Sequence, residues 1–370
     1  MSNVVKFCLG LGLLSTFAHA DFEILREKLN DAILSKTIFA GQFLLHKNAV
    51  FNPSADGLIY NGIRQFDKKN VVLKFMENER AAMREFEMYW YLKPIYELGT
   101  LEKFGFADVL HYGKWEGYHL LVLSNFHGDY LSPNLMKSFF NAKSSSYVIN
   151  GLLLFRNFVR QSKLMHSRGI RHDNINPHNI MMQNCHKFLI NFNSGSKIHE
   201  HNECGTPKYA SRKYHRNETR TASCDWESFF YSMCDMYGIE LDWFSNPDMS
   251  DGEYLRHKND QMAIKRKIRE SMEENELQII FIWFTIELFK EDPFPNYDHS
   301  EELINLKIKT LNLHPKYANF WCMKIRKPFA EIREDESSEP QFSIEEHIVS
   351  PQSIDFRQYE YPIVNFAYFS

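Results

Sequence analysis

A polar loop between two apolar stretches holds the residues best placed to do chemistry. The segment GIRHDNINPHNIMM carries Asp173, Asn174, Asn176 and Asn179, and the segment FLINFNSGSKI follows closely with Asn191. The apolar flanks predict a strand end and a short strand pair, so loop and turn should form one compact polar site. Such a site can supply positioned charges and metal ligands, which phosphoryl transfer requires.

The spacing within this loop resembles the protein-kinase pattern H-R-D-L-x-x-x-N. When the two are aligned on Pro177 and Asn179, His172 takes the His position and Asn174 takes that of the catalytic Asp. Asn176 then falls where many Ser/Thr kinases keep a Lys that touches the transferred phosphate. The resemblance therefore places three asparagines at functional positions of the loop.

Other kinase motifs follow in the expected order. The D-F-G pattern appears as Asn191-Phe192-Asn193, and VVLK resembles V-A-I-K with Lys74 as the phosphate-binding Lys. Glu85 stands where the helix Glu that holds this Lys belongs, and apolar spacing favours it over Glu87. Of the glycine-rich loop only Gly57 survives. By this resemblance Gly57, Lys74 and Glu85 would contact a nucleotide.

Three later segments resemble casein kinase 1 and its relatives. They are CGTPKYAS (204–211), CDWESFFY (224–231) and PFPNYDHSEELI (293–304). With the earlier motifs, the resemblance spans roughly residues 40–310. It implies an α+β fold of two lobes, a small β-rich N-lobe and a larger helical C-lobe.

The order of predicted elements agrees with two lobes. Short β-rich runs fill residues 38–125, interrupted by one helical stretch, ERAAMREFEMYWYL, and helical patterns dominate from about residue 135. The apolar run at 279–289 is typical of a core helix. We expect a kinase-like domain over 21–312, divided into an N-lobe at about 38–125 and a C-lobe at about 126–312.

The departures from the motifs predict a pseudokinase. Asn174 cannot accept the substrate proton, and general-base assistance contributes roughly 10²–10⁴ in rate. Asn179 and Asn191 occupy the metal-ligand positions, where the neutral oxygen of Asn191 replaces the carboxylate that Mg²⁺ favours. Asn176 removes a further charge. No catalytic residue is intact, no cofactor is certain, and Mg²⁺ is not expected to bind strongly.

Three alternatives remain open in the sequence. A loop longer by one residue would present Arg171-His172-Asp173 as H-R-D, with Asp173 as base. Lys74 and Glu85 leave ATP binding without metal open, or even a divergent secretory-pathway Ser/Thr protein kinase. A small-molecule phosphotransferase shares the His-x-Asp…Asn loop, but CGTPKYAS and CDWESFFY argue against it.

The first twenty residues resemble a secretory signal peptide. Lys6 supplies the basic region, an apolar run of about eleven residues follows, and Ala18-His19-Ala20 fits a cleavage site after Ala20. The run is too short to span a bilayer, and no later run is long enough, so no membrane span is expected. We expect a secreted or lumenal protein with a glycosylation sequon at Asn217.

The composition excludes one class of partner but identifies none. Hydrophobic content of 44% and charged content of 24% are ordinary for globular proteins. A net charge of −4 gives no electrostatic footprint for nucleic acid, so an unidentified protein partner is expected. Cys8 lies in the leader, and the odd number of remaining cysteines leaves at least one without an intrachain disulfide. Residues 313–370 form an extension with an acidic linker and an aromatic end, which either docks on the domain or stays poorly ordered.

Overall fold

The computed structural model describes residues 23–54, 57–92, 104–124, 129–130, 145–183, 186–201, 205–273, 275–290 and 292–311. The chain divides into two units, Met1–Lys327 and Pro328–Ser370, and every described residue belongs to the first. The predicted signal peptide and the extension at 313–370 lie outside the described residues. No helix among the described residues is long and apolar enough to cross a membrane.

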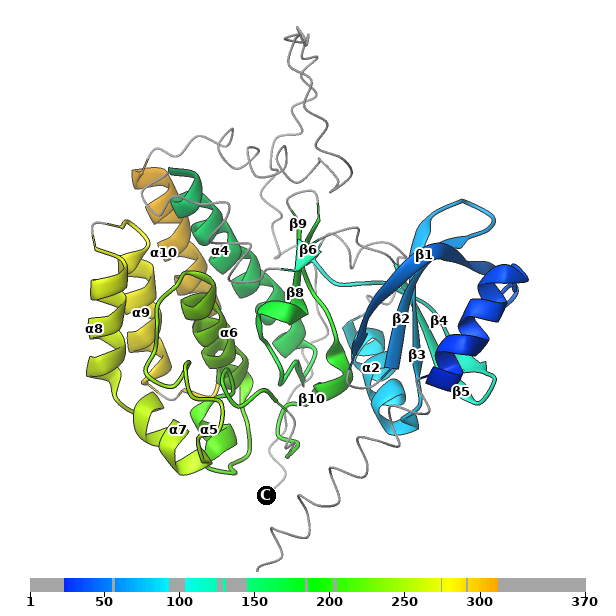
Figure 1. Ribbon diagram of the computed structural model, residues 1–370. Helices are drawn as coiled ribbons and strands as arrows, with labels where there is room; N and C mark the ends of the chain where they lie inside the picture. Colours follow the sequence, from blue (N-terminus) through cyan, green and yellow to red (C-terminus); the bar gives the residue numbers. More distant parts are fainter. Residues whose placement is uncertain are drawn as a thin grey trace, which may run out of the picture. The chain divides into compact units, whose positions relative to one another are not determined.

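The N-lobe is built on an antiparallel sheet of five strands in the order β1-β2-β3-β5-β4 (Figure 1). The strands are β1 (Phe43–Ser54), β2 (Gly57–Arg64), β3 (Asn70–Met76), β4 (Val109–Trp115) and β5 (Tyr118–Ser124). Successive side chains of a strand point to opposite faces. Leu73 and Phe75 of β3 therefore pack into one apolar cluster, whereas Lys74 between them points to the opposite face.

A helix over residues 23–34, which the sequence patterns did not predict, packs on the sheet face that carries Leu73. Leu25, Leu29 and Ala32 recur at helical spacing and are buried in the same cluster as Phe39 and Phe75. The helix therefore covers this face of the N-lobe sheet with apolar side chains.

The predicted helix of the N-lobe is α2 (Glu79–Leu92). It begins after Asn78, whose side-chain Oδ1 accepts a hydrogen bond from the backbone N–H of Ala81 at 3.1 Å. Glu85 lies on the buried side of α2 and is 1% exposed, whereas Glu87 is exposed. The helix thus brings Glu85 towards the face of the sheet that carries Lys74.

The C-lobe is mainly helical (Figure 1). Its helices are α4 (Ser145–Ser167), α5 (Arg212–His215), α6 (Ala222–Met236), α7 (Asp251–Lys258), α8 (Gln261–Ser271), α9 (Gln278–Leu288) and α10 (Tyr297–Thr310). At the centre, α6 is buried along almost its whole length. The ring of Phe158 on α4 stacks on that of Phe229 on α6 with centroids 3.7 Å apart.

Short strands and 3₁₀ turns of the C-lobe carry the polar loops. They are β6 (Asp129–Tyr130), β7 (Ile170–Arg171), η2 (Pro177–Asn179), β8 (Ile180–Gln183), β9 (His186–Leu189), η3 (Phe192–Ser194) and β10 (Ser196–Lys197). The predicted α+β fold with two lobes is confirmed. The core-helix prediction for 279–289 is only half right, because Ile280 and Phe281 are buried but Ile279 and Ile286 are exposed.

Candidate functional site

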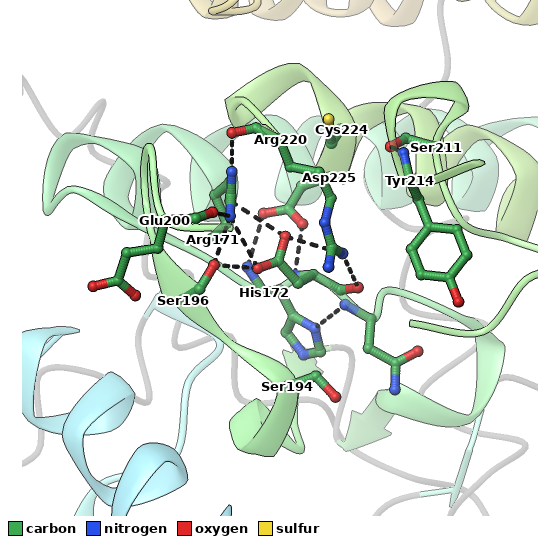
Figure 2. Close-up of polar contacts among 12 residues, drawn as sticks. Arg171, His172, Ser194, Ser196, Glu200, Ser211, Tyr214, Arg220, Cys224 and Asp225 are labelled. Atoms are coloured by element: carbon green, nitrogen blue, oxygen red, sulfur yellow. Dashed lines mark hydrogen bonds and ion pairs between the residues drawn. The ribbon is translucent and has the colours of Figure 1, made fainter. Parts of the chain in front are cut away.

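Asp225, near the start of α6, fixes the loop that carries Asn174. Its carboxylate accepts hydrogen bonds from the backbone N–H groups of His172 and Asp173, both at 2.9 Å. Burial opposes ionisation, but hydrogen bonding and charge from His166, together with His172, hold the pKa of Asp225 below its usual value. An ionised side chain buried in the helical core thus fixes two consecutive peptide groups of the loop (Figure 2).

His172 joins this loop to the turn that follows β9. Its Nε2 donates to the backbone oxygen of Ile190 at 2.9 Å, and its Nδ1 accepts from the backbone N–H of Asn174 at 3.3 Å. The imidazole ring also lies against Phe192, with centroids 4.5 Å apart. Burial lowers the pKa of His172, and the two hydrogen bonds fit only the neutral ring.

The predicted nucleotide residues Lys74 and Glu85 form a buried ion pair. Lys74 Nζ lies 2.6 Å from Glu85 Oε2, with the two side chains 4% and 1% exposed. The same ammonium donates to Asn191 Oδ1 at 3.0 Å. Strand β3, helix α2 and the turn at η3 therefore meet at one lysine.

The asparagines extend this contact into a chain of hydrogen bonds. Asn191 Nδ2 donates to Asn179 Oδ1 at 3.2 Å, and Asn179 Nδ2 donates to the backbone oxygen of Asn174 at 2.8 Å. Asn174 Oδ1 accepts from Asn176 Nδ2 at 3.2 Å and from Thr206 Oγ1 at 2.9 Å. We call the linked residues Lys74, Glu85, Asn191, Asn179, Asn174, Asn176 and Thr206 the amide chain.

Metal binding finds little support in the amide chain. The side-chain oxygens of Asn179 and Asn191, at the two predicted metal-ligand positions, already accept hydrogen bonds from Asn191 and Lys74. The one carboxylate in the chain, that of Glu85, is paired with Lys74. Nor do the described residues contain a group of three or more His, Cys, Asp or Glu side chains placed to hold a metal. These residues do not fit Mg²⁺, which favours carboxylates and phosphates.

Asp173 lies outside the amide chain. Its backbone adopts φ 61°, and its carboxylate contacts Arg171 Nε at 3.2 Å and Arg220 Nη1 at 3.4 Å. It also accepts from the hydroxyl of Ser196, and all these side chains are buried. Figure 2 shows Arg171, Arg220 and Ser196 converging on one cluster. This geometry does not favour the reading of Asp173 as a catalytic base, because the cluster occupies its carboxylate.

The segment after Gly205 is held by a buried lysine that the motifs did not reveal. Lys258 Nζ donates to the backbone oxygens of Ala210 and Pro207 at 2.6 and 2.9 Å and contacts His215 Nε2 at 2.9 Å. Three aromatic rings lie within 6 Å of this nitrogen. Burial lowers the pKa of Lys258 to about 7, against the attraction of Glu227 and Asp251.

The remaining predicted residues are not members of the amide chain. Gly57 pairs with Met76 in the sheet, and a Cβ there would approach the backbone oxygen of Phe75 to 2.0 Å, so close strand packing alone requires glycine. Asn217 is exposed and follows α5 with φ 54°. Cys224 and Cys234 are buried free thiols, and burial raises the pKa of both.

The structure assigns contacts with the loop to two residues that the sequence analysis did not treat as site residues. Asp225 and Thr206 belong to segments that the sequence singled out, but their contacts with the loop depend on tertiary packing. In the sequence, these two residues stood out only as members of the motifs CDWESFFY and CGTPKYAS.

Comparison with solved structures places the fold among protein kinases. The chain is similar to vaccinia related kinase 3, with a TM-score of 0.56 over 78% of this chain and 97% of that chain. Sequence identity is 14%, so the likeness concerns the fold alone. No protein-family model and no curated protein sequence matches the chain. The fold is that of a protein-kinase-like module.

Proposed function

We propose that this protein is a secreted, casein-kinase-1-like pseudokinase that acts as a non-catalytic binding module. The observation that carries the proposal is the amide chain from Lys74 through Asn191 and Asn179 to Asn174. In it, neutral amides stand where phosphoryl transfer needs a proton acceptor and an anionic metal ligand. These amides hydrogen-bond to one another, which supports a site that does not depend on a metal.

Loss of the proton acceptor and loss of the anionic metal ligand affect different steps. Asn174 offers no basic group, which removes general-base assistance of roughly 10²–10⁴ in rate. Asn191 offers a neutral oxygen that Lys74 already occupies, which weakens the binding of a metal-nucleotide complex before any chemistry. Both losses support a role in binding a protein partner rather than in turnover.

Weak nucleotide binding without metal is the second part of the proposal. Lys74 uses two of its three N–H donors on Glu85 and Asn191, which leaves one for a phosphate oxygen. The intact Lys74–Glu85 pair is also what favours the alternative function, a divergent Ser/Thr protein kinase of the secretory pathway.

A thermal-shift titration with ATP, with and without Mg²⁺ or Mn²⁺, tests both parts. We expect at most a small shift that metal does not increase. Clear metal-dependent stabilisation, together with phosphate incorporation that Lys74→Ala abolishes, would establish the kinase alternative. Because Lys74→Ala leaves Glu85 buried without its partner, folding of the variant is checked by circular dichroism.

Secretion rests on the leader and is tested separately. Expressed in a eukaryotic secretory cell, the protein should appear in the medium with Asp21 as its first residue. Asn217 is exposed, so Asn217→Gln should remove one glycan from its mass. Recovery of the chain from the cytosol with Met1 intact would refute the secretion proposal.

A further inference from the structure

Exposed apolar side chains gather on three helices at one side of the C-lobe. Met262 on α8 is 67% exposed, Ile279 and Ile286 on α9 are 55% and 42% exposed, and Leu306 on α10 is 58% exposed. We call these four residues the α9 face. Contiguous apolar patches on a protein surface commonly mark interaction sites.

The three helices lie next to one another, with α9 between α8 and α10 (Figure 1). On the α8 side, Gln278 Nε2 donates to the backbone oxygen of Met272 at 3.2 Å. On the α10 side, the ring of Trp283 lies 6.0 Å from that of His299. Successive residues of an α-helix are rotated by about 100° around its axis, so Gln278 and Trp283 lie on either side of the strip that carries Ile279 and Ile286. This strip therefore faces outward, between α8 and α10.

The composition of α9 makes its exposure unusual. Its sequence, QIIFIWFTIEL, is apolar on all sides, and such helices are normally buried all round. Ile280, Phe281 and Phe284 fill the core on the inner side, but nothing in the described residues buries Ile279 and Ile286 on the outer side. The outer side therefore has the character of an interface.

Opposite charges flank the α9 face. Helix α8 presents the exposed Arg269 and also Arg266, whose side chain is 65% exposed and lies 4.0 Å from Glu270 of the same helix, whereas α10 presents the exposed Glu302. Both helices run antiparallel to α9. The start of α9 lies near the end of α8, where Gln278 contacts Arg269, and near the end of α10, where Glu276 pairs with Lys307. Arg269 and Glu302 consequently lie at similar heights on opposite sides of the apolar strip.

We propose that the α9 face binds a second copy of this chain, related by a two-fold axis parallel to α9. That axis places α8 of each copy against α10 of the other, so that Arg269 meets Glu302 of the second copy. A two-fold axis across α9 would instead set the basic α8 against its own copy, which like charges disfavour. With the two-fold axis parallel to α9, the charges of one copy therefore face opposite charges of the other, as an isologous interface requires.

The size of the face sets the expected strength. A helix of 11 residues is about 16 Å long, and three helices side by side are about 25 Å wide. The projected area of about 400 Å² is below the ~800 Å² per partner of a standard interface. We therefore expect a weak dimer with a dissociation constant in the micromolar range, on the order of 1–100 μM.

Sedimentation velocity of the mature chain over about 1–100 μM tests the proposal. The wild type should shift from monomer to dimer, and Ile279→Glu should remain monomeric. Phe66→Glu is the matched control, because Phe66 is 71% exposed in the N-lobe, so this variant should dimerise normally. Circular dichroism confirms that each variant is folded.

A charge swap makes the test specific for self-association. Arg269→Glu and Glu302→Arg should each weaken the dimer by about tenfold, and the double variant should recover most of the loss. A wild type that stays monomeric over the whole range, a dimer that survives Ile279→Glu, or a double variant without recovery would each overturn the proposal. This assay involves no nucleotide, so its outcome is independent of the pseudokinase proposal.

Discussion

Lys74 and Asn191 are joined by a hydrogen bond of 3.0 Å from the lysine Nζ to the amide Oδ1. This contact links the N-lobe sheet to the turn after β9, and it occupies the oxygen that the kinase resemblance assigns to a metal. A carboxylate in place of Asn191 would carry a full charge beside the same lysine and keep a second oxygen for a cation. The difference between the amide and the acid is therefore accessible to experiment.

Asn174→Asp combined with Asn191→Asp should restore metal-dependent nucleotide binding before it restores activity. By the kinase resemblance, one carboxylate would take the position of the metal ligand and the other that of the base, and hydrogen bonds to charged groups contribute about 1.5–3 kcal/mol. We expect Mg²⁺–ATP to bind at least about tenfold more tightly by calorimetry. Asn246→Asp adds one negative charge at an exposed site and should not change the affinity. Unchanged affinity in the double variant would show that the loop alignment is wrong.

The buried pair of Lys74 and Glu85 should behave as a unit in stability measurements. Lys74→Met leaves a buried carboxylate without its partner, which costs about 3–5 kcal/mol. Adding Glu85→Gln removes that charge and should recover a large part of the loss. Urea unfolding of both single variants and the double variant gives the coupling energy. Additive losses would mean that the two residues do not stabilise the fold as a pair.

Spacing located the asparagines, but not the contacts among them. Asn174, Asn176 and Asn179 share one short loop, so their order could be read directly from the sequence. The hydrogen bond from Lys74 to Asn191 spans 117 positions and depends on how β3 packs against the turn at η3. The two-lobed fold was predictable because many ordered motifs agreed. The helix over 23–34 was missed, since its few apolar residues gain meaning only against the sheet.

Asp173 should matter for stability and not for any reaction. Asp173→Asn leaves Arg171 and Arg220 buried without their shared carboxylate, so we expect a loss of about 3–5 kcal/mol. Asp173→Asn with Arg220→Gln removes one charge of each sign and should be more stable than the single variant. Differential scanning calorimetry compares the two. If Asp173→Asn instead abolished a measurable phosphate transfer while the fold stayed stable, the reading of Asp173 as a base would regain support.

Acid should destabilise the protein through His172. Burial lowers its pKa in the folded state below the ordinary value of 6.5, so the unfolded state binds more protons as the pH falls through 6.5. The free energy of unfolding should therefore decrease below about pH 6.5, by up to about 1.4 kcal/mol per pH unit for this group. Protonation would also break the hydrogen bond that Nδ1 accepts from the backbone of Asn174.

His172→Phe should show a smaller decrease in the free energy of unfolding between pH 6.5 and 5, measured by urea titration. The control His201→Asn, at an exposed histidine, should keep the wild-type slope. An equal slope in His172→Phe would assign the acid sensitivity to other groups, among which His215 also has a pKa lowered by burial.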